Sequence, residues 1–128
     1  MCSSDLPSIV LYPDGTPFLT IGTPGGLRIW PTITQIMERM IDYGMDIQEA
    51  IDTARIFDRG RYELDYESAG VTPVTPEVIA ELEARGHAPV DKGSWNLFFG
   101  GVQGIAILKD GTLRGGADPR RDGKALAY

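Results

Sequence analysis

Several residue types on which common functional sites depend are scarce in this sequence. The 128 residues include one cysteine, Cys2, so the chain can form neither an internal disulfide nor a cysteine-rich zinc module. The single histidine, His87, likewise excludes a metal site built from several histidines. No apolar run reaches the roughly 20 residues of a membrane-spanning helix. Residues 1–7 lack the basic start and apolar stretch of a secretion signal.

Positive charge is also in short supply. The 12 Lys and Arg residues against 18 Asp and Glu residues give a net charge of −6. Binding to nucleic acid or to an anionic membrane needs a basic face, so we expect neither as a partner. The apolar content of 42% is ordinary for a packed core. The sequence has no repeat and no linker, and residues 1–128 are therefore expected to form a single segment.

Glycine and proline are abundant, at 16 and 9 residues, and divide the chain into short elements. Residue patterns predict strands over 8–12, 17–21, 61–67, 102–108 and 112–114, with 61–67 exposed or at an edge and 102–108 well buried. Helical spacing predicts a helix over 29–41, and the capping residues Asp46 and Thr75 predict two more. Strands at both ends and helices in the middle favour an α+β fold with a largely antiparallel sheet.

Gly25 and Gly26 lie where a predicted strand passes through a loop into a helix. Neither has a Cβ atom, so a ligand oxygen can approach their main-chain N–H groups closely. Such a site suits a carboxylate, a phosphate or the oxyanion of an acyl-transfer intermediate. The alternative is a tight turn that only reverses the chain, and these two residues taken alone favour that alternative.

Other candidate residues have a structural alternative too. Ser3 and Ser4 could donate to a substrate carboxylate or satisfy loop backbone. Nothing in the sequence places a serine near His87 for a catalytic triad, and Cys2 would be a self-activated nucleophile only at a processed N-terminus. The arginines of segment 118–123 could brace carboxylates of the fold or form an anion clamp.

The order of several short motifs resembles the γ-glutamyltransferase family. The pair Ser3-Ser4 is followed by Pro7 and a strand, by an Asp-Gly turn at 14–15, and by residues 22–29 (GTPGGLRI). Further similar segments follow in the family's order at 41–45, 49–50, 54–55, 86–87 and 116–123. Each motif alone is weak, but their order and spacing extend the resemblance over essentially the whole chain.

The resemblance implies an N-terminal-nucleophile (Ntn) hydrolase built as an αββα sandwich. In that family a precursor cleaves itself and exposes a threonine, which takes the γ-glutamyl group of a glutathione-like donor and passes it to water, an amino acid or a peptide. By position, Ser3 and Ser4 match the serines that bind the donor. Gly25 and Gly26 match the glycines whose N–H groups form the oxyanion hole. We expect no cofactor and no metal.

The family's threonine nucleophile and the arginine of its large subunit have no counterpart in these residues. We therefore expect the C-terminal part of a small subunit, inactive alone, whose partners are the large subunit and the upstream part of the small subunit. Apolar surface that meets those parts would make the isolated chain self-associate. Relatives that deacylate β-lactam side chains or cleave poly-γ-glutamate stay open as alternatives, as does a non-catalytic carboxylate-binding module. The family is often periplasmic or secreted, and the sequence itself indicates no compartment.

Overall fold

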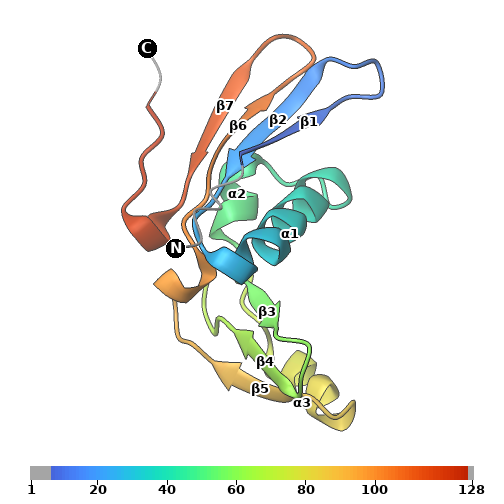
Figure 1. Cartoon of the computed structure of the whole chain (residues 1–128), viewed down its shortest axis with the longest axis vertical. Helices are drawn as coiled ribbons and strands as arrows, with labels where there is room; N and C mark the ends of the chain where they lie inside the picture. The colour runs from blue at the N-terminus through green and yellow to red at the C-terminus, as the bar shows by residue number, and fades with distance from the viewer. Residues whose placement is uncertain (1–6, 127–128) are drawn as a thin grey trace.

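A computed structural model of the chain describes residues 7–126. The strands are β1 (Ser8–Leu11), β2 (Pro17–Gly22), β3 (Ile56–Asp58), β4 (Glu63–Tyr66), β5 (Ala88–Asp91), β6 (Gln103–Ile107) and β7 (Leu113–Ala117). The helices are α1 (Ile29–Ile41), α2 (Ile47–Asp52) and α3 (Pro76–Ala84), with short 3-10 turns η1 (Gly26–Arg28), η2 (Leu97–Phe99) and η3 (Pro119–Arg121). Figure 1 shows two lobes, each built on its own sheet, one above the other in an elongated chain.

The upper lobe is an antiparallel sheet with the strand order β1-β2-β6-β7. The strands predicted over 8–12 and 17–21 are confirmed as β1 and β2, which pair as an antiparallel hairpin. At its turn the Asp14 carboxylate accepts hydrogen bonds from the N–H and hydroxyl of Thr16. The β6–β7 turn is closed in the same way, because Asp110 accepts from the Thr112 N–H. These hydrogen bonds lower the pKa of both aspartates below its usual value.

Helix α1 packs on one face of this sheet, as its spacing predicts. Ile33 and Ile36 on its inner face are buried against Leu19 and Ile21 of β2. Burial of these branched apolar side chains is the main favourable contribution to this part of the fold. The helix ends before Gly44, which adopts the left-handed φ of 68° expected of a helix stop.

The predicted helix caps are also confirmed. The Asp46 side chain accepts from the Glu49 N–H at 2.9 Å and begins α2. The Thr75 side chain accepts from the Val78 N–H at 3.5 Å and begins α3. Each cap satisfies an N–H group that has no partner inside its own helix. Within residues 7–126, no helix is both long and apolar enough to cross a bilayer.

Helix α2 lies directly on the sheet because the strands beneath it carry glycine. Gly104 of β6 and Gly116 of β7 are direct partners in the sheet. A Cβ atom on Gly116 would lie 2.8 Å from side-chain carbons of Ile47 and Ile51 on α2. The helix therefore contacts strand backbone at a distance that no other residue would permit.

The lower lobe holds a second sheet with the order β3-β4-β5 and helix α3. Strands β3 and β4 are antiparallel, whereas β4 and β5 are parallel and joined through α3. The strand predicted over 61–67 is confirmed as β4, but its predicted edge or exposed position is wrong, because β4 is central and residues 64–67 include the buried Leu64, Asp65 and Glu67. Two of the polar positions that suggested a solvent-facing strand hold buried carboxylates: Asp65 pairs with Arg59 and Lys92, and Glu67 pairs with Arg120. The short strands β3 and β5 were not predicted.

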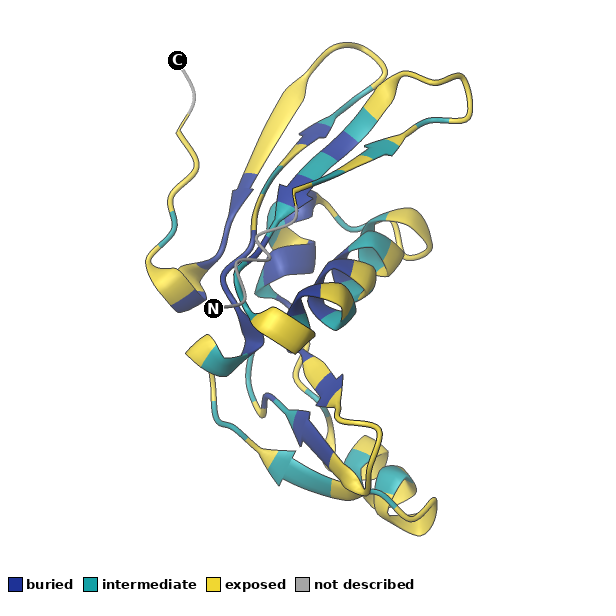
Figure 2. Cartoon of the chain, viewed as in Figure 1, coloured by how far each residue is buried: buried dark blue, intermediate teal, exposed yellow. Residues whose placement is uncertain are grey.

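The prediction of a well-buried strand over 102–108 is wrong in part. Val102 and Ala106 are buried, but Ile105 is 43% exposed, because the helices cover only one face of the upper sheet (Figure 2). We call the uncovered side the outer face; Ile9 and Leu113, 70% and 65% exposed, also lie on it. The upper lobe is therefore a sheet with helices on one side, and its other side is exposed apolar surface.

Candidate functional site

The loop between β2 and α1 carries the two glycines that the sequence singles out. Gly25 has a φ of 153° and Gly26 a φ of 60°, values that favour glycine. Their carbonyl groups accept hydrogen bonds from the N–H groups of Arg28, the last residue of η1, and Ile29, the first residue of α1. Neither glycine's own N–H donates to an acceptor within residues 7–126. Gly26 is exposed and Gly25 half-buried.

A second glycine loop holds the first one in place. The Gly101 N–H donates to Thr23 Oγ1 at 3.1 Å, and this hydroxyl donates to the Pro24 carbonyl at 3.0 Å. Gly100 has a φ of 90°, and a Cβ atom there would lie 2.6 Å from Thr23 Oγ1 and 2.7 Å from the Pro24 oxygen. We call these four residues the clasp. Because Thr23 is buried, water cannot compete for its hydrogen bonds.

Next to the clasp, four charged side chains form what we call the buried ion network: Arg55, Glu67, Asp118 and Arg120. Arg55 Nη2 lies 2.7 Å from Asp118 Oδ2, and Arg120 pairs with both Asp118 and Glu67. No member is more than 4% exposed. Two positive and two negative charges compensate one another, which buried charges require.

The network also fixes the segment that forms the clasp. Arg55 Nη1 donates to the Phe99 carbonyl at 3.0 Å, and the Thr32 hydroxyl donates to the same oxygen at 3.2 Å. Asp118 accepts from the Val102 N–H at 2.8 Å. Both ends of the glycine pair 100–101 are therefore anchored. Burial lowers the pKa of Arg55 to about 10, so the guanidinium stays charged at neutral pH.

The sequence left two interpretations of segment 118–123, an anion clamp or arginines that brace carboxylates of the fold. For Arg120 the structure supports the second. Arg120 donates to the carboxylates of Glu67 and Asp118 and to the carbonyls of Ile51 and Thr53. Its guanidinium nitrogens are thus occupied by the protein, which leaves none for a clamped anion. The sequence offered no signal for Glu67, because a carboxylate in an alternating strand usually faces solvent.

The other candidates from the sequence are not brought to the glycine loop by the described residues. Ser3, Ser4 and Cys2 lie outside residues 7–126. His87 lies in the turn between α3 and β5 of the lower lobe. Residues 7–126 contain no group of three His, Cys, Asp or Glu side chains that could hold a metal ion.

The fold defines the class to which the chain belongs. Its antiparallel sheet with helices packed on it matches solved structures of the Ntn-hydrolase fold, as expected from the sequence. A model of the Gamma-glutamyltranspeptidase family matches residues 1–128. The chain therefore belongs to the γ-glutamyltranspeptidase family.

Individual relatives agree with this assignment. A glutathione hydrolase proenzyme of Bacillus subtilis strain 168 is 33% identical over 128 residues, which cover 96% of this chain and 20% of the relative. The Acylase ACY 1 proenzyme of Pseudomonas sp. strain SE83 is 37% identical over 115 residues, 89% of this chain and 19% of the relative. The structure of γ-glutamyltranspeptidase from Pseudomonas nitroreducens complexed with L-DON superposes with a TM-score of 0.82 at 32% identity, over 100% of this chain and 64% of that one.

The chain is short beside these relatives. It spans about a fifth of the length of the two curated relatives that it matches. Because the chain corresponds to only part of a protein of this family, we propose its activity separately below.

Proposed function

We propose that this chain forms the oxyanion-stabilising half of a γ-glutamyl-transfer active site in a longer protein. In the proposed reaction a threonine, which we do not assign to any residue of this chain, takes the γ-glutamyl group from a glutathione-like donor. Water, an amino acid or a peptide then removes the group. The N–H groups of Gly25 and Gly26 donate to the carbonyl oxygen as it gains negative charge, and Ser3 and Ser4 hold the carboxylate end of the donor.

One observation carries this proposal: two main-chain donors stand on a loop that the protein holds in place. The N–H groups of Gly25 and Gly26 have no acceptor within residues 7–126, while the clasp fixes the preceding Thr23 and Pro24. Donors that are already aimed stabilise a developing oxyanion without reorganising during the reaction. Membership of the γ-glutamyltranspeptidase family supports the same reaction class.

The test compares two glycines in the longer protein that carries the nucleophile. Gly26 and Gly44 have φ values of 60° and 68°, and a Cβ atom on either would meet nothing within 4 Å. Gly26→Ala and Gly44→Ala therefore carry the same backbone cost, about 1–2 kcal/mol. We expect only Gly26→Ala to lower kcat for release of a chromogenic amine from a γ-glutamyl anilide, by about tenfold or more. Alanine keeps the N–H but strains the left-handed φ that directs it, and outright loss of one oxyanion donor typically costs about 10²–10³.

Equal losses in the two variants, or an unchanged kcat in Gly26→Ala, would contradict the oxyanion role. The chain of 128 residues alone is the baseline of this experiment. It should release no amine, because we assign it the donors of an acyl-transfer site and no attacking atom. Turnover by the purified chain alone would refute this division of the site.

Acylase activity is the second candidate function. The acylase relative shares a larger fraction of identical residues than the glutathione hydrolase relative does, and acyl transfer to water uses the same kind of main-chain donors. The rates of the longer protein on a γ-glutamyl anilide, a side-chain-acylated β-lactam and poly-γ-glutamate would separate these activities. A non-catalytic carboxylate-binding module would instead bind glutamate to the isolated chain, which calorimetry measures.

A further inference from the structure

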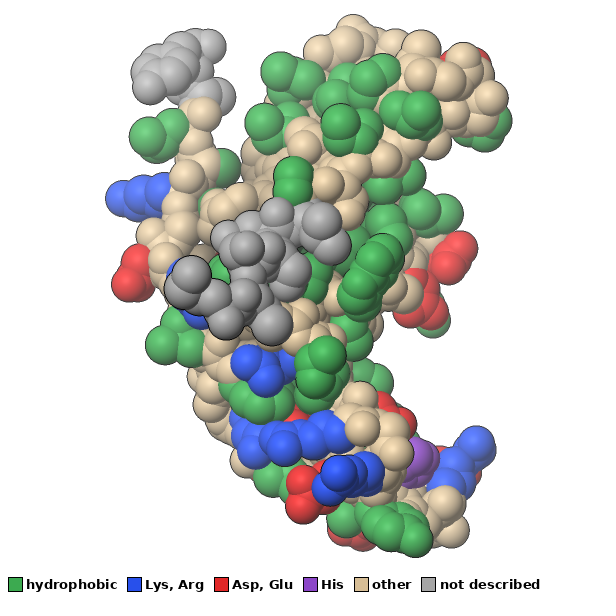
Figure 3. Space-filling model, in the orientation of Figure 1, with side chains coloured by type: hydrophobic (Ala, Val, Ile, Leu, Met, Phe, Trp, Pro, Cys, Tyr) green, Lys and Arg blue, Asp and Glu red, His purple; other side chains and the backbone are tan. Residues whose placement is uncertain are grey.

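A cleft of about 1200 Å³ separates the start of α1 from the lower sheet. Apolar side chains, Leu27, Phe57 and Phe98, line it together with the arginines Arg28 and Arg61. Figure 3 shows Lys and Arg side chains gathered over the lower half of the displayed face. A cluster of cations beside apolar surface stands out in a chain whose net charge is −6.

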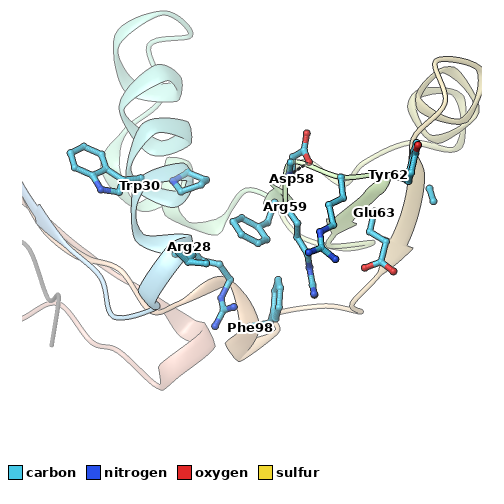
Figure 4. Close-up of a pocket in the computed structure, with 13 residues that line it drawn as sticks. Arg28, Trp30, Asp58, Arg59, Tyr62, Glu63 and Phe98 are labelled. Atoms are coloured by element: carbon cyan, nitrogen blue, oxygen red, sulfur yellow. Dashed lines mark hydrogen bonds between the residues drawn. The ribbon is translucent and has the colours of Figure 1, made fainter. Parts of the chain in front are cut away.

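Three cations surround the ring of Phe98. The Arg28 guanidinium lies 4.3 Å from the ring centre, Lys92 Nζ 5.2 Å and the Arg59 guanidinium 5.6 Å. In Figure 4, Arg28 and Arg59 extend from opposite sides of the cleft toward Phe98. Each contact with the ring is favourable, but the like charges repel one another, and the arrangement needs compensating negative charge.

The available carboxylates compensate only part of this charge. Asp65 lies 2.9 Å from Arg59 Nε and 3.0 Å from Lys92 Nζ. Asp58, which caps the Gly60 N–H, and Glu63 both line the cleft, but Figure 4 shows their carboxylates directed away from Phe98.

Among the described residues, Arg28 is left without a counter-charge. Within residues 7–126 it has no ion-pair partner, and its buried Nε has no hydrogen-bond partner. A buried guanidinium N–H without a partner is costly, and an anion that accepts from the terminal nitrogens of Arg28 would supply the missing counter-charge. Arg61, exposed at the rim, likewise has no ion-pair partner among these residues.

We propose that this cleft binds a small organic anion in which a carboxylate is joined to an apolar group. The carboxylate would accept from Arg28 and Arg61, and the apolar part would lie against Leu27 and Phe57. The volume exceeds the roughly 300–1000 Å³ of typical small-molecule sites, so water accompanies the ligand. The residues that line the cleft begin at Leu27 and do not include Gly25 or Gly26, and this proposal does not depend on the proposed function.

The test follows binding to the whole chain by NMR, through the amide signals of Leu27 and Arg28 and the ring signals of Phe98, with the Gly25 and Gly26 amides as the reference for binding at the glycine loop. The probe is 3-phenylpropanoate, compared with its uncharged amide and with acetate, which lacks the apolar part. We expect saturable shifts with 3-phenylpropanoate and weaker binding of both comparison compounds. Arg28→Gln should lower the affinity about tenfold, the usual effect of losing one charged hydrogen bond.

Two further variants separate binding from folding. Because Arg28 packs on Phe98, its replacement also removes a packing contact, whereas Arg61 is exposed and Arg61→Gln should weaken binding without loss of stability. Arg114→Gln removes the same charge from an exposed position on β7 and should leave the affinity unchanged. Shifts that do not saturate, equal effects of Arg114→Gln and Arg28→Gln, or equal affinity for the amide would overturn the proposal. Protection of the η1 amides from hydrogen exchange in the longer protein without ligand would overturn it too, since another part of the protein would then occupy the cleft.

Discussion

The clasp shows how single atoms set the distance between two loops. Thr23 supplies one hydroxyl that is at once acceptor for Gly101 and donor to Pro24. Gly100 allows the close approach because it has no side chain; a Cβ atom there would clash with both Thr23 and Pro24. The peptide unit that follows Pro24 carries the Gly25 N–H, so the direction of that donor depends on the clasp.

Replacing Thr23 by valine tests this dependence. Thr23→Val keeps the shape but leaves the Gly101 N–H buried without its acceptor, at a cost of about 1–3 kcal/mol. If the proposed oxyanion site is correct, kcat of the longer protein falls while KM changes little, because the donors act on the transition state more than on the bound donor. Steady-state kinetics on a γ-glutamyl anilide measure the split, and Thr23→Ser should restore kcat.

Thr32→Val is the matched control for this experiment. Thr32 is an equally buried threonine, and it donates to Phe99 in the same segment. The Phe99 oxygen keeps its bond from Arg55 when the Thr32 hydroxyl is lost. Thr32→Val should therefore lower stability and leave kcat unchanged. A parallel loss of kcat in both variants would mean that the clasp acts only through stability.

Among the secondary-structure elements, the sequence predicts those that depend on residues close together in the chain. The caps at Asp46 and Thr75, the turn at Asp14 and the apolar face of α1 depend on residues a few positions apart, and each was predicted correctly. β5 was missed because Pro89 lies inside it and strands seldom tolerate proline. The edge or exposed position predicted for β4 was wrong because Asp65 in the strand pairs with Arg59 and Lys92, and Glu67 just after it pairs with the distant Arg120.

Contacts between residues far apart in the sequence also limit how much of the site could be predicted. The two glycines and their chemistry follow from the sequence, whereas the clasp needs Thr23 to meet Gly101 across the fold. The arginine partners of Glu67 come from two separate segments. No spacing in the chain indicates either meeting.

The buried ion network gives a stability prediction at this scale. Glu67→Gln keeps the size of the side chain but removes one buried charge and turns an N–H₂ group toward the guanidinium of Arg120. We expect a loss of about 3–5 kcal/mol in the free energy of unfolding, as for other broken buried pairs. Chemical denaturation of the chain followed by circular dichroism measures it.

An exposed pair in the same chain provides the control. Glu81 and Arg85 form an ion pair on α3 with side chains 62% and 70% exposed. Glu81→Gln should cost about 0–1 kcal/mol, because water and ions screen such pairs. Similar losses for Glu67→Gln and Glu81→Gln would show that burial contributes nothing to the network.

For the whole molecule, the uncovered outer face is the dominant surface feature. Ile9, Ile105 and Leu113 lie exposed on it, and a hollow of about 820 Å³ runs beside them over β2, β6 and β7. An apolar sheet face of this kind normally packs against another layer. In the αββα sandwich implied by the family resemblance, that layer is a second sheet.

The isolated chain should therefore self-associate through the outer face. We expect light scattering to report a mass that rises with concentration. The double variant Ile105→Thr with Leu113→Thr should shift the chain toward monomer, because threonine suits strands but lowers the apolar area. Val78→Thr on exposed α3 is the control. A monodisperse wild-type monomer, or an equal response to the control, would show that the outer face does not cause association.

The glycines under α2 link the centre of the upper sheet to the two loops of the site. Gly116 lets Ile47 and Ile51 rest on the strands, and the carbonyl of Ile51 in turn receives both Arg55 and Arg120. A larger side chain at this position would push α2 away from the sheet. Because Arg55 and Arg120 both donate to the Ile51 carbonyl, this shift would displace both guanidinium groups. The distance between α2 and the sheet thus sets the alignment of distant main-chain donors.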